Sequence, residues 1–578
     1  MKNKIKKIEG IVIATTLLFG SGFSSIGSFI NGKAEYLNSA TIVIDEELGD
    51  LNILTRTKGS YTADMVHTMT YDRLWRLDEE ENFCLDLLES WELLNFDGGE
   101  SSVSPLPYPN INSALGWENP PAFVELVLVS DNDRGALSCT LREGVQFHDG
   151  DYLTTESLVN LVNFARMQPT DTLIYQTWAP VVITPITNYR FNLGVDEDNF
   201  DLSIFDVMYN LASPQGSIVC VHEGATGDEG YPVGSGAYTL QQVGDNGASV
   251  ELERWDNWWN TEIVPTQYVT FEFCYNYEEI FNGFGSDYYQ TAVMRFGYIE
   301  TGFYLEWMSG QGLDYYLHIN EIEDQPYAMF FNLDIQNSMF GFKGYRQAAT
   351  FALEKNTIRE MGGLDGGSND YWCYLTNDDV EENCHLGIRD NAFEYAQDLV
   401  AADSNMFMQS EINIIVYEED AFANATELAY YNAICVNVQA NLISLFGDYS
   451  CDVNLVPVSE SEMAEYEANG NYDIILKEID LHNVSSARNA LYGLGDNAID
   501  AWLDCVTISG DVNTYKLSHL AAQYYNYSDS MFVTNLGWQK RAVIRNANVS
   551  GISVCNGFNP MGDSSTLDFR FIAVTGNE

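Results

Sequence analysis

Alternating strand and helix patterns in the C-terminal half constrain the fold more than any other feature of the sequence. Ile412–Tyr417 is an apolar strand pattern, and Ala421–Phe446 repeats apolar residues at the three- and four-residue spacing of a helix. Cys451–Val456 alternates as a strand, Ser459–Glu467 carries the capping-box spacing of a short helix, and Tyr472–Leu476 is typical of a buried strand. This order predicts a parallel α/β lobe.

The chain has more residues than one hydrophobic core accommodates. It contains 578 residues, of which 46% are hydrophobic, so several packed units are expected and bulk disorder is excluded. Outside the α/β pattern, further strands are expected at Thr41–Ile44, Ala237–Gln241, Ser249–Arg254 and Tyr327–Asn332.

The charge of the chain limits its partners. It carries 84 acidic and 27 basic residues, which gives a net charge of −57. A surface this negative repels phosphate backbones and anionic lipids, so we expect no nucleic-acid partner.

The N-terminus has the pattern of an export signal. Lysines at positions 2, 4, 6 and 7 precede an apolar stretch from Ile11 to Ile30. Cleavage near Ala34 would release the mature chain, and the alternatives are an uncleaved membrane anchor or an ordinary hydrophobic helix. The signal predicts a protein that is exported to the periplasm or the cell surface.

Motifs for catalysis, metal binding and phosphate binding are absent from the sequence. There is no H-E-x-x-H, no phosphate-binding G-x-x-x-x-G-K-[ST] and no C-x-x-C pair, so we predict no catalytic residue, no metal site and no cofactor. Asp131–Asp133 starts like a calcium loop but lacks the glycine and glutamate that must follow, which favours a solvated acidic turn. Cys373 with Cys384, and Cys435 with Cys451, could close loops or remain buried free thiols.

Four sequence blocks follow one another in a fixed order. The blocks are Tyr71–Leu74 with Leu88–Glu92, Leu141–Gly150 (LREGVQFHDG) with the helix to Arg166, Pro232–Leu240 (PVGSGAYTL) with Leu252–Arg254 and Trp258–Asn260, and Met329–Asn332 with Tyr345–Ala349. Together they resemble the extracellular solute-binding proteins of oligopeptide, dipeptide and nickel ABC importers. Their glycines and turns also have plain structural roles, so they indicate the fold rather than ligand contacts.

The resemblance implies an α/β, two-lobed periplasmic-binding-protein-like fold with a hinge and an extra subdomain on the first lobe. The implied division is a signal or anchor at 1–34, lobe I at 35–70, 191–324 and 531–578, the extra subdomain at 71–190, and lobe II at 325–530.

The resemblance also implies a function. The chain would be a monomeric, non-enzymatic receptor that captures peptides and delivers them to ABC permease subunits in the membrane. Another small solute, such as a sugar or a chelated metal, is the alternative ligand, and an extracellular glycan hydrolase is the alternative from another class. The lipid-modified cysteine of many family members is missing, because the first cysteine is Cys84.

Five ligand-binding residues follow from the position of the family's binding strands. Asp480, just after the strand Tyr472–Leu476, is the candidate partner of a peptide α-ammonium, because a buried cation needs an anion beside it. Lys477 and Glu478 would pair with the ligand backbone. Ser60 and Tyr61 would face them from the first lobe. A solvated acidic loop is the alternative interpretation of the segment around Asp480.

Overall fold

The computed structural model describes residues 37–78, 83–94, 102–103, 127–128, 136–196, 200, 202–221, 230–260, 266–274, 276–286, 288–295, 317–365, 392–403, 408–422, 425–479, 531, 533–546, 548–559 and 562–575. The expected signal, Asp131–Asp133, Cys373, Cys384 and Asp480 lie outside the described residues. Within these ranges, no helix has the length and the apolar run needed to cross a bilayer.

One mixed sheet of eleven strands runs through the molecule, in the order β10-β11-β12-β1-β13-β19-β14-β18-β16-β17, with β15 beside β19. The bounds of its strands are β1 Ser39–Ile44, β10 Tyr238–Val243, β11 Ser249–Arg254, β12 Tyr268–Phe273, β13 Thr291–Arg295, β14 Leu317–Phe331, β15 Leu364–Asp365, β16 Glu411–Tyr417, β17 Asp452–Val458, β18 Ile474–Glu478 and β19 Val533–Asn546.

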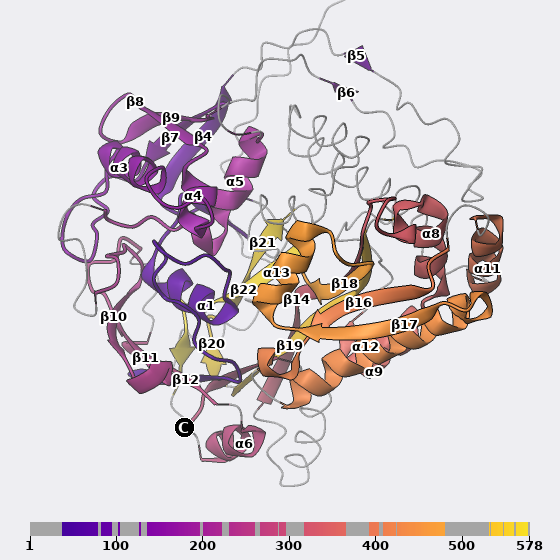
Figure 1. The fold of residues 1–578 in the computed structure, drawn as a ribbon. Coiled ribbons are helices and arrows are strands. Elements are labelled where there is room, and N and C mark those ends of the chain that lie inside the picture. The colour runs from indigo at the N-terminus through magenta and orange to yellow at the C-terminus, as the bar shows by residue number, and fades with distance from the viewer. Residues whose placement is uncertain are drawn as a thin grey trace, which may run out of the picture.

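Two long antiparallel strands, β14 and β19, connect the two lobes. β19 pairs with β13 of the first lobe through residues 541–545, and β14 pairs with β18 of the second lobe through residues 327–331. The two strands pair with each other along nearly their whole length. Figure 1 shows them between the indigo and purple elements of the first lobe and the orange elements of the second lobe.

The first lobe buries both faces of its sheet. Ile42 and Ile44 of β1 pack into one core with helix α1 (Tyr61–Thr70), whereas Val43 packs into another with helix α6 (Tyr277–Gly285). Successive side chains of a strand point to opposite faces, so the run Ile42–Ile44 is apolar at every position because each face is covered.

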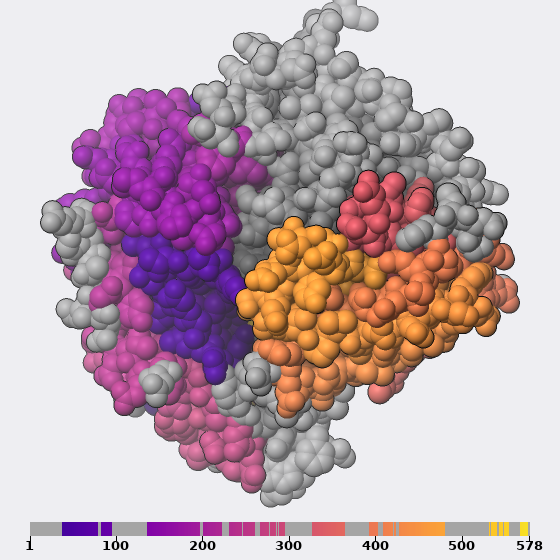
Figure 2. Space-filling view, viewed as in Figure 1, coloured from indigo at the N-terminus to yellow at the C-terminus, as the bar shows by residue number. Residues whose placement is uncertain are grey.

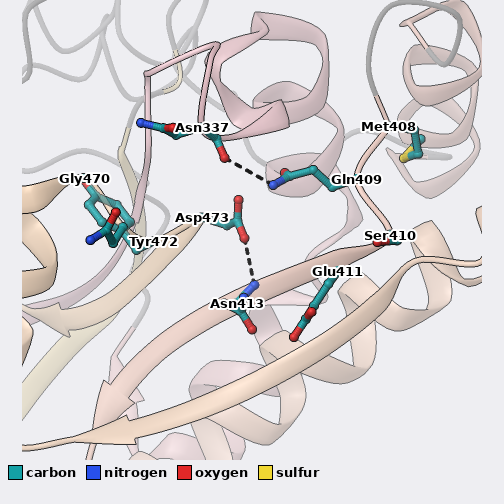
Figure 3. Close-up of a pocket in the computed structure, with 10 residues that line it drawn as sticks. Asn337, Met408, Gln409, Ser410, Glu411, Asn413, Gly470, Tyr472 and Asp473 are labelled. Atoms are coloured by element: carbon teal, nitrogen blue, oxygen red, sulfur yellow. Dashed lines mark hydrogen bonds between the residues drawn. The ribbon is translucent and has the colours of Figure 1, made fainter.

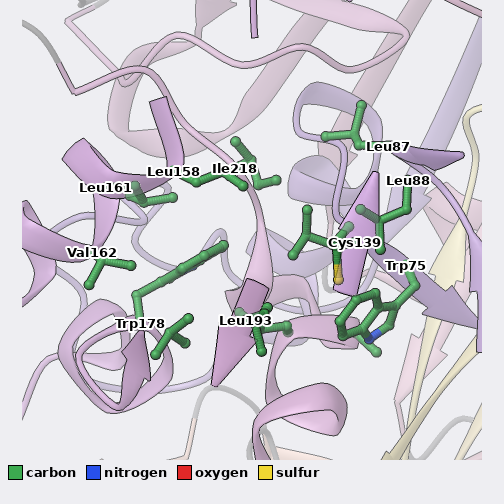
Figure 4. Close-up of a cluster of buried hydrophobic side chains, with 14 of the residues drawn as sticks. Trp75, Leu87, Leu88, Cys139, Leu158, Leu161, Val162, Trp178, Leu193 and Ile218 are labelled. Atoms are coloured by element: carbon green, nitrogen blue, oxygen red, sulfur yellow. The ribbon is translucent and has the colours of Figure 1, made fainter. Parts of the chain in front are cut away.

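A second sheet, β4-β7-β9-β8, lies beside the first lobe with helices α3, α4 and α5. The bounds of these elements are β4 Leu88–Leu94, β7 Ala136–Leu141, β8 Val181–Pro185, β9 Arg190–Val195, α3 Thr155–Ala165, α4 Leu173–Trp178 and α5 Ile204–Ala212. Leu137, Cys139 and Leu141 alternate into a core that also contains Trp178 and Leu193 (Figure 4). The same core takes in α5 and reaches Val233.

The second lobe confirms the α/β pattern predicted from the sequence. β16 pairs in parallel with β17 and with β18. The connecting helices are α12 (Ala425–Phe446) and α13 (Glu460–Asn469). Helices α8 (Lys343–Ala352), α9 (Lys355–Gly362) and α11 (Ala392–Asp403) complete this lobe.

The remaining elements are short. They are β2 Trp75–Leu77, β3 Phe83–Leu85, β5 Ser102–Val103, β6 Val127–Leu128, β20 Val549–Ser550, β21 Ser553–Asn559, β22 Gly562–Asp568 and β23 Ala573–Val574, with 3-10 turns at Pro214–Gly216, Asp245–Gly247, Met339–Gly341, Glu419–Ala421 and Gly447–Tyr449.

Candidate functional site

The carboxyl edge of the second-lobe sheet faces the first lobe. β16, β17 and β18 are mutually parallel and end on the same edge, and α13 starts there. Lys58, in the loop between β1 and α1, forms an ion pair with Glu460 of α13. In Figure 2 the indigo N-terminal residues and the orange second-lobe residues meet at this point. The predicted site residues lie on these elements.

Ser60 and Tyr61 begin helix α1. Ser60 is its N-cap, and its Oγ accepts a hydrogen bond from the Ala63 amide at 3.3 Å. Tyr61 is buried, with the guanidinium carbon of Arg541 over its ring at 3.7 Å. Arg541 Nη1 also donates to Glu46 Oε2 at 2.7 Å. A cation on an aromatic face with a carboxylate beside it holds the start of α1 against β19.

Lys477 and Glu478 end strand β18. Lys477 pairs with Glu467 of α13, and its Nζ lies 5.0 Å from the centre of the Phe330 ring. Glu478 Oε1 accepts a hydrogen bond from Gln539 Nε2 at 2.5 Å.

Strand β19 connects the two groups of predicted residues. Gln539 and Arg541 are two positions apart, so their side chains point to the same face of the strand. Gln539 contacts Glu478 of the second lobe, and Arg541 contacts Tyr61 and Glu46 of the first. Tyr61 of the first lobe and Glu478 of the second lobe therefore contact neighbouring side chains of β19, a strand that both lobes share.

This edge of the second lobe is acidic. Burial raises the pKa of Tyr417, at the end of β16, and the negative charges of Glu478, Glu460 and Glu467 raise it further. The cations described beside these acids, Lys58 and Lys477, are themselves paired with Glu460 and Glu467. A negative potential of this kind attracts a positively charged group of a ligand.

The sequence did not predict five residues of this region, which are Glu46, Lys58, Glu460, Gln539 and Arg541. Only tertiary structure brings them to this place. Only Arg541 could have been singled out from the sequence. Basic residues are scarce in this chain, and a buried arginine needs a specific acidic partner.

The family blocks serve the fold, as the sequence indicated. His148 of the FHDG turn lies against the glycine-rich block, where its Nε2 is 3.0 Å from the Gly236 carbonyl oxygen. Burial lowers the pKa of His148 to about 4, so the ring is neutral at physiological pH. Arg346 Nη1 donates to the carbonyl oxygens of Phe340 and Gly341 at 2.7 and 3.1 Å, which anchors helix α8.

One group of potential metal ligands occurs among the described residues. Ligand atoms of Asp149, Asp151 and Cys220 lie within 4.8 Å of one another. The two carboxylates are exposed on the FHDG turn, where Asp149 Oδ1 accepts from the Asp151 amide at 3.0 Å. Turn geometry thus accounts for the position of Asp149.

The thiols of Cys435 and Cys451 are free. Both residues are buried, and burial is the main cause that raises the pKa of Cys435 to about 12 and that of Cys451 to about 11. Of the two readings that the sequence left open for this pair, the structure supports buried free thiols.

The sequence of this fold matches a family model. Residues 87–371 match the model of the bacterial extracellular solute-binding proteins, family 5 Middle. This match confirms the resemblance that the sequence blocks carry. The family model and the two-lobed fold support a solute-binding receptor of an ABC importer. None of the curated proteins matches the sequence.

Solved structures share the fold of this chain across its length. NikA from Brucella suis, in complex with Fe(III)-EDTA, is 14% identical with a TM-score of 0.64, over 93% of this chain and 100% of that one. A putative peptide binding protein, AppA from Clostridium difficile, is 13% identical with a TM-score of 0.63 and the same two coverages. Haemophilus influenzae OppA, in complex with the peptide RPPGFSPFR, is 13% identical with a TM-score of 0.61, over 94% and 100%.

Proposed function

We propose that this receptor binds peptides in extended form between its lobes and delivers them to ABC permease subunits. One observation carries the proposal. The acidic carboxyl end of β18 and the loop before α1 both contact β19, which the two lobes share, and the Lys58–Glu460 pair joins that loop to the second lobe. An extended peptide suits this place because its backbone pairs with strands regardless of its side chains. Its α-ammonium suits the negative potential of the edge.

Asp480 is the proposed partner of that ammonium. It directly follows Ile479, whose amide donates to the Pro326 carbonyl at 3.0 Å and so continues the pairing of β18 with β14. Ser60, Tyr61, Lys477 and Glu478 are proposed to line the same site. A chelated metal or a sugar is the alternative solute, and the Fe(III)-EDTA bound by the structural neighbour NikA favours the chelate.

The proposal includes a monomeric, exported protein without enzymatic activity. It also divides the chain into two lobes and an extra subdomain. We extend the subdomain beyond Arg190 to include β9 and α5, because these elements share its sheet and its core.

Calorimetry with short peptides tests the ammonium site. Asp480→Asn should weaken binding of free peptides by roughly 2–5 kcal/mol, because the buried ammonium loses its anion. N-acetylated peptides should bind the parent protein weakly and lose little in the variant. Asp452→Asn, an exposed change at the opposite edge of the lobe, is the matched control and should have no effect. Equal binding of free and acetylated peptides would reject the assignment.

A further inference from the structure

A polar pocket lies at the opposite edge of the second lobe, away from the proposed peptide site. Its volume is about 570 Å³, within the usual range of small-molecule sites. It opens where β16 begins and where the chain enters β18 (Figure 3). The residues that line it are Asn337, Met408, Gln409, Ser410, Glu411, Asn413, Gly470, Asn471, Tyr472 and Asp473.

The walls of the pocket are held in place by side chains that are already hydrogen-bonded. Asp473 is buried; its Oδ1 accepts from Ser338 Oγ at 2.7 Å, and its Oδ2 accepts from the Asn413 amide at 2.9 Å. Gln409 accepts from the Met339 amide at 2.8 Å and donates to the Asn337 carbonyl at 3.3 Å. These bonds join β16, the turn before β18 and the segment after β14, so the cavity is preformed.

The turn that closes the pocket is fixed from behind. Asn332 Nδ2 donates to the carbonyl oxygens of Gly470 and Tyr472, at 2.9 and 2.7 Å. Buried Asn332 therefore holds residues 470–472 in position without lining the pocket itself.

The chemistry of the lining excludes most ligand classes. The ten lining residues include no Lys or Arg, so a phosphate or carboxylate finds no cation there. A bare cation is disfavoured too, because both Asp473 oxygens and Glu411 Oε1 already accept hydrogen bonds, the latter from Asn454 at 2.7 Å. Amide groups predominate, and they both donate and accept. Tyr472 and Met408 add some apolar surface.

We propose that this pocket is a second binding site, for a neutral saccharide. Sugar hydroxyl groups donate and accept hydrogen bonds as the amides do. The apolar surface of Tyr472 and Met408 suits the C–H face of a sugar ring. Because the pocket and the peptide site lie at opposite edges of the sheet, both can be occupied at once.

Saturation-transfer NMR with the full chain tests this proposal, using methyl β-glucoside and N-acetylglucosamine as probes and glucuronate as the anionic comparison. Both neutral sugars should receive magnetisation, and glucuronate should receive much less. Asn471→Ala and Asn413→Ala should each weaken sugar binding at least tenfold. Asn469→Ala, an exposed asparagine just outside the pocket, should not.

Neither alanine variant removes a main-chain hydrogen bond, so a loss of sugar binding does not reflect misfolding. The main-chain amide of residue 413 still donates to Asp473, and that of residue 471 still donates to the Tyr466 carbonyl oxygen. No transfer to either sugar, or transfer that both variants leave unchanged, would overturn the proposal. Peptide binding measured on the same samples is expected to stay intact, so failure here is distinct from failure of the receptor function.

Discussion

At the scale of single residues, a buried ionic cluster joins the two ends of the chain. Arg570 Nη1 and Nη2 donate to Asp72, Asp86 and Asp568 at 3.2, 3.1 and 2.8 Å, and all four residues are buried. Asp72 also accepts from the indole nitrogen of Trp259 at 2.8 Å. The carboxylate of Asp72 therefore joins the block Tyr71–Leu74 to the block Trp258–Asn260.

The pKa of Asp72 predicts a pH-dependent stability. Burial, and then the charge of Asp86, raise this pKa to about 7, whereas the charge of Arg570 holds the pKa of Asp568 below its usual value. The folded state thus binds a proton at Asp72 more tightly than the unfolded state, so this group's contribution to stability declines as pH rises from about 4 to about 7. Asp568 acts in the opposite sense, and its contribution is lost below about pH 4.

Asp72→Asn should remove the part of the pH dependence that lies between pH 4 and pH 7. Urea unfolding at pH 5 and pH 7 measures it as the difference in the free energy of unfolding, which should be smaller in the variant than in the parent. Asp245→Asn, at an exposed aspartate, should leave the difference unchanged. An identical difference in Asp72→Asn and the parent would contradict the raised pKa.

At the scale of elements, the glycine-rich block packs closely against the end of α1. A Cβ on Gly236 would lie 2.4 Å from the Met69 carbonyl oxygen and 2.5 Å from the Thr70 carbonyl carbon, both backbone atoms that cannot turn aside. The Gly236 amide also donates to the Thr70 carbonyl at 3.0 Å. Only glycine permits this approach.

Gly236→Ala should therefore destabilise the protein by about 1–3 kcal/mol or more, as overpacking of a close contact does. Gly194→Ala is the matched control, because a Cβ there meets nothing within 4 Å. Thermal unfolding should show a clear decrease of the midpoint for the first variant only. Equal midpoints for the two variants would contradict the close approach of Gly236 to the backbone of Met69 and Thr70.

Elements were predictable from the sequence where apolar side chains alone define them. Ser249–Arg254 coincides with β11, and the predicted strand at Ile412–Tyr417 lies within β16, because their buried positions are occupied by apolar residues. The connecting strand β19 was not predicted: buried Gln539 and Arg541 interrupt its apolar pattern. Those residues are tolerated only because Glu478 and Glu46 lie beside them, which local sequence does not reveal.

At the scale of the whole molecule, Lys58 and Glu460 form an ion pair between the lobes. Both side chains are mostly exposed, at 65% and 63%, so the pair contributes at most about 1 kcal/mol and is weakened by salt. Hinge closure on a ligand is the working motion of such folds, and this pair favours the closed arrangement.

Reversing one charge of this pair should shift the molecule towards open forms. Lys58→Glu is expected to lower the closed-to-open ratio by up to about fivefold at low salt, and Lys58→Glu with Glu460→Lys should restore it. Donor and acceptor dyes on the two lobes measure the ratio. Lys343→Glu, which changes the net charge equally, should not alter it. Failure of the double variant to restore closure would argue against a direct pair.

Mass spectrometry of the ligand released from natively purified protein tests the receptor account most directly. We predict one peptide per protein molecule, released on denaturation and chemically intact. Recovery of a sugar or a metal chelate with no peptide, or turnover of added peptides without a stable complex, would contradict it.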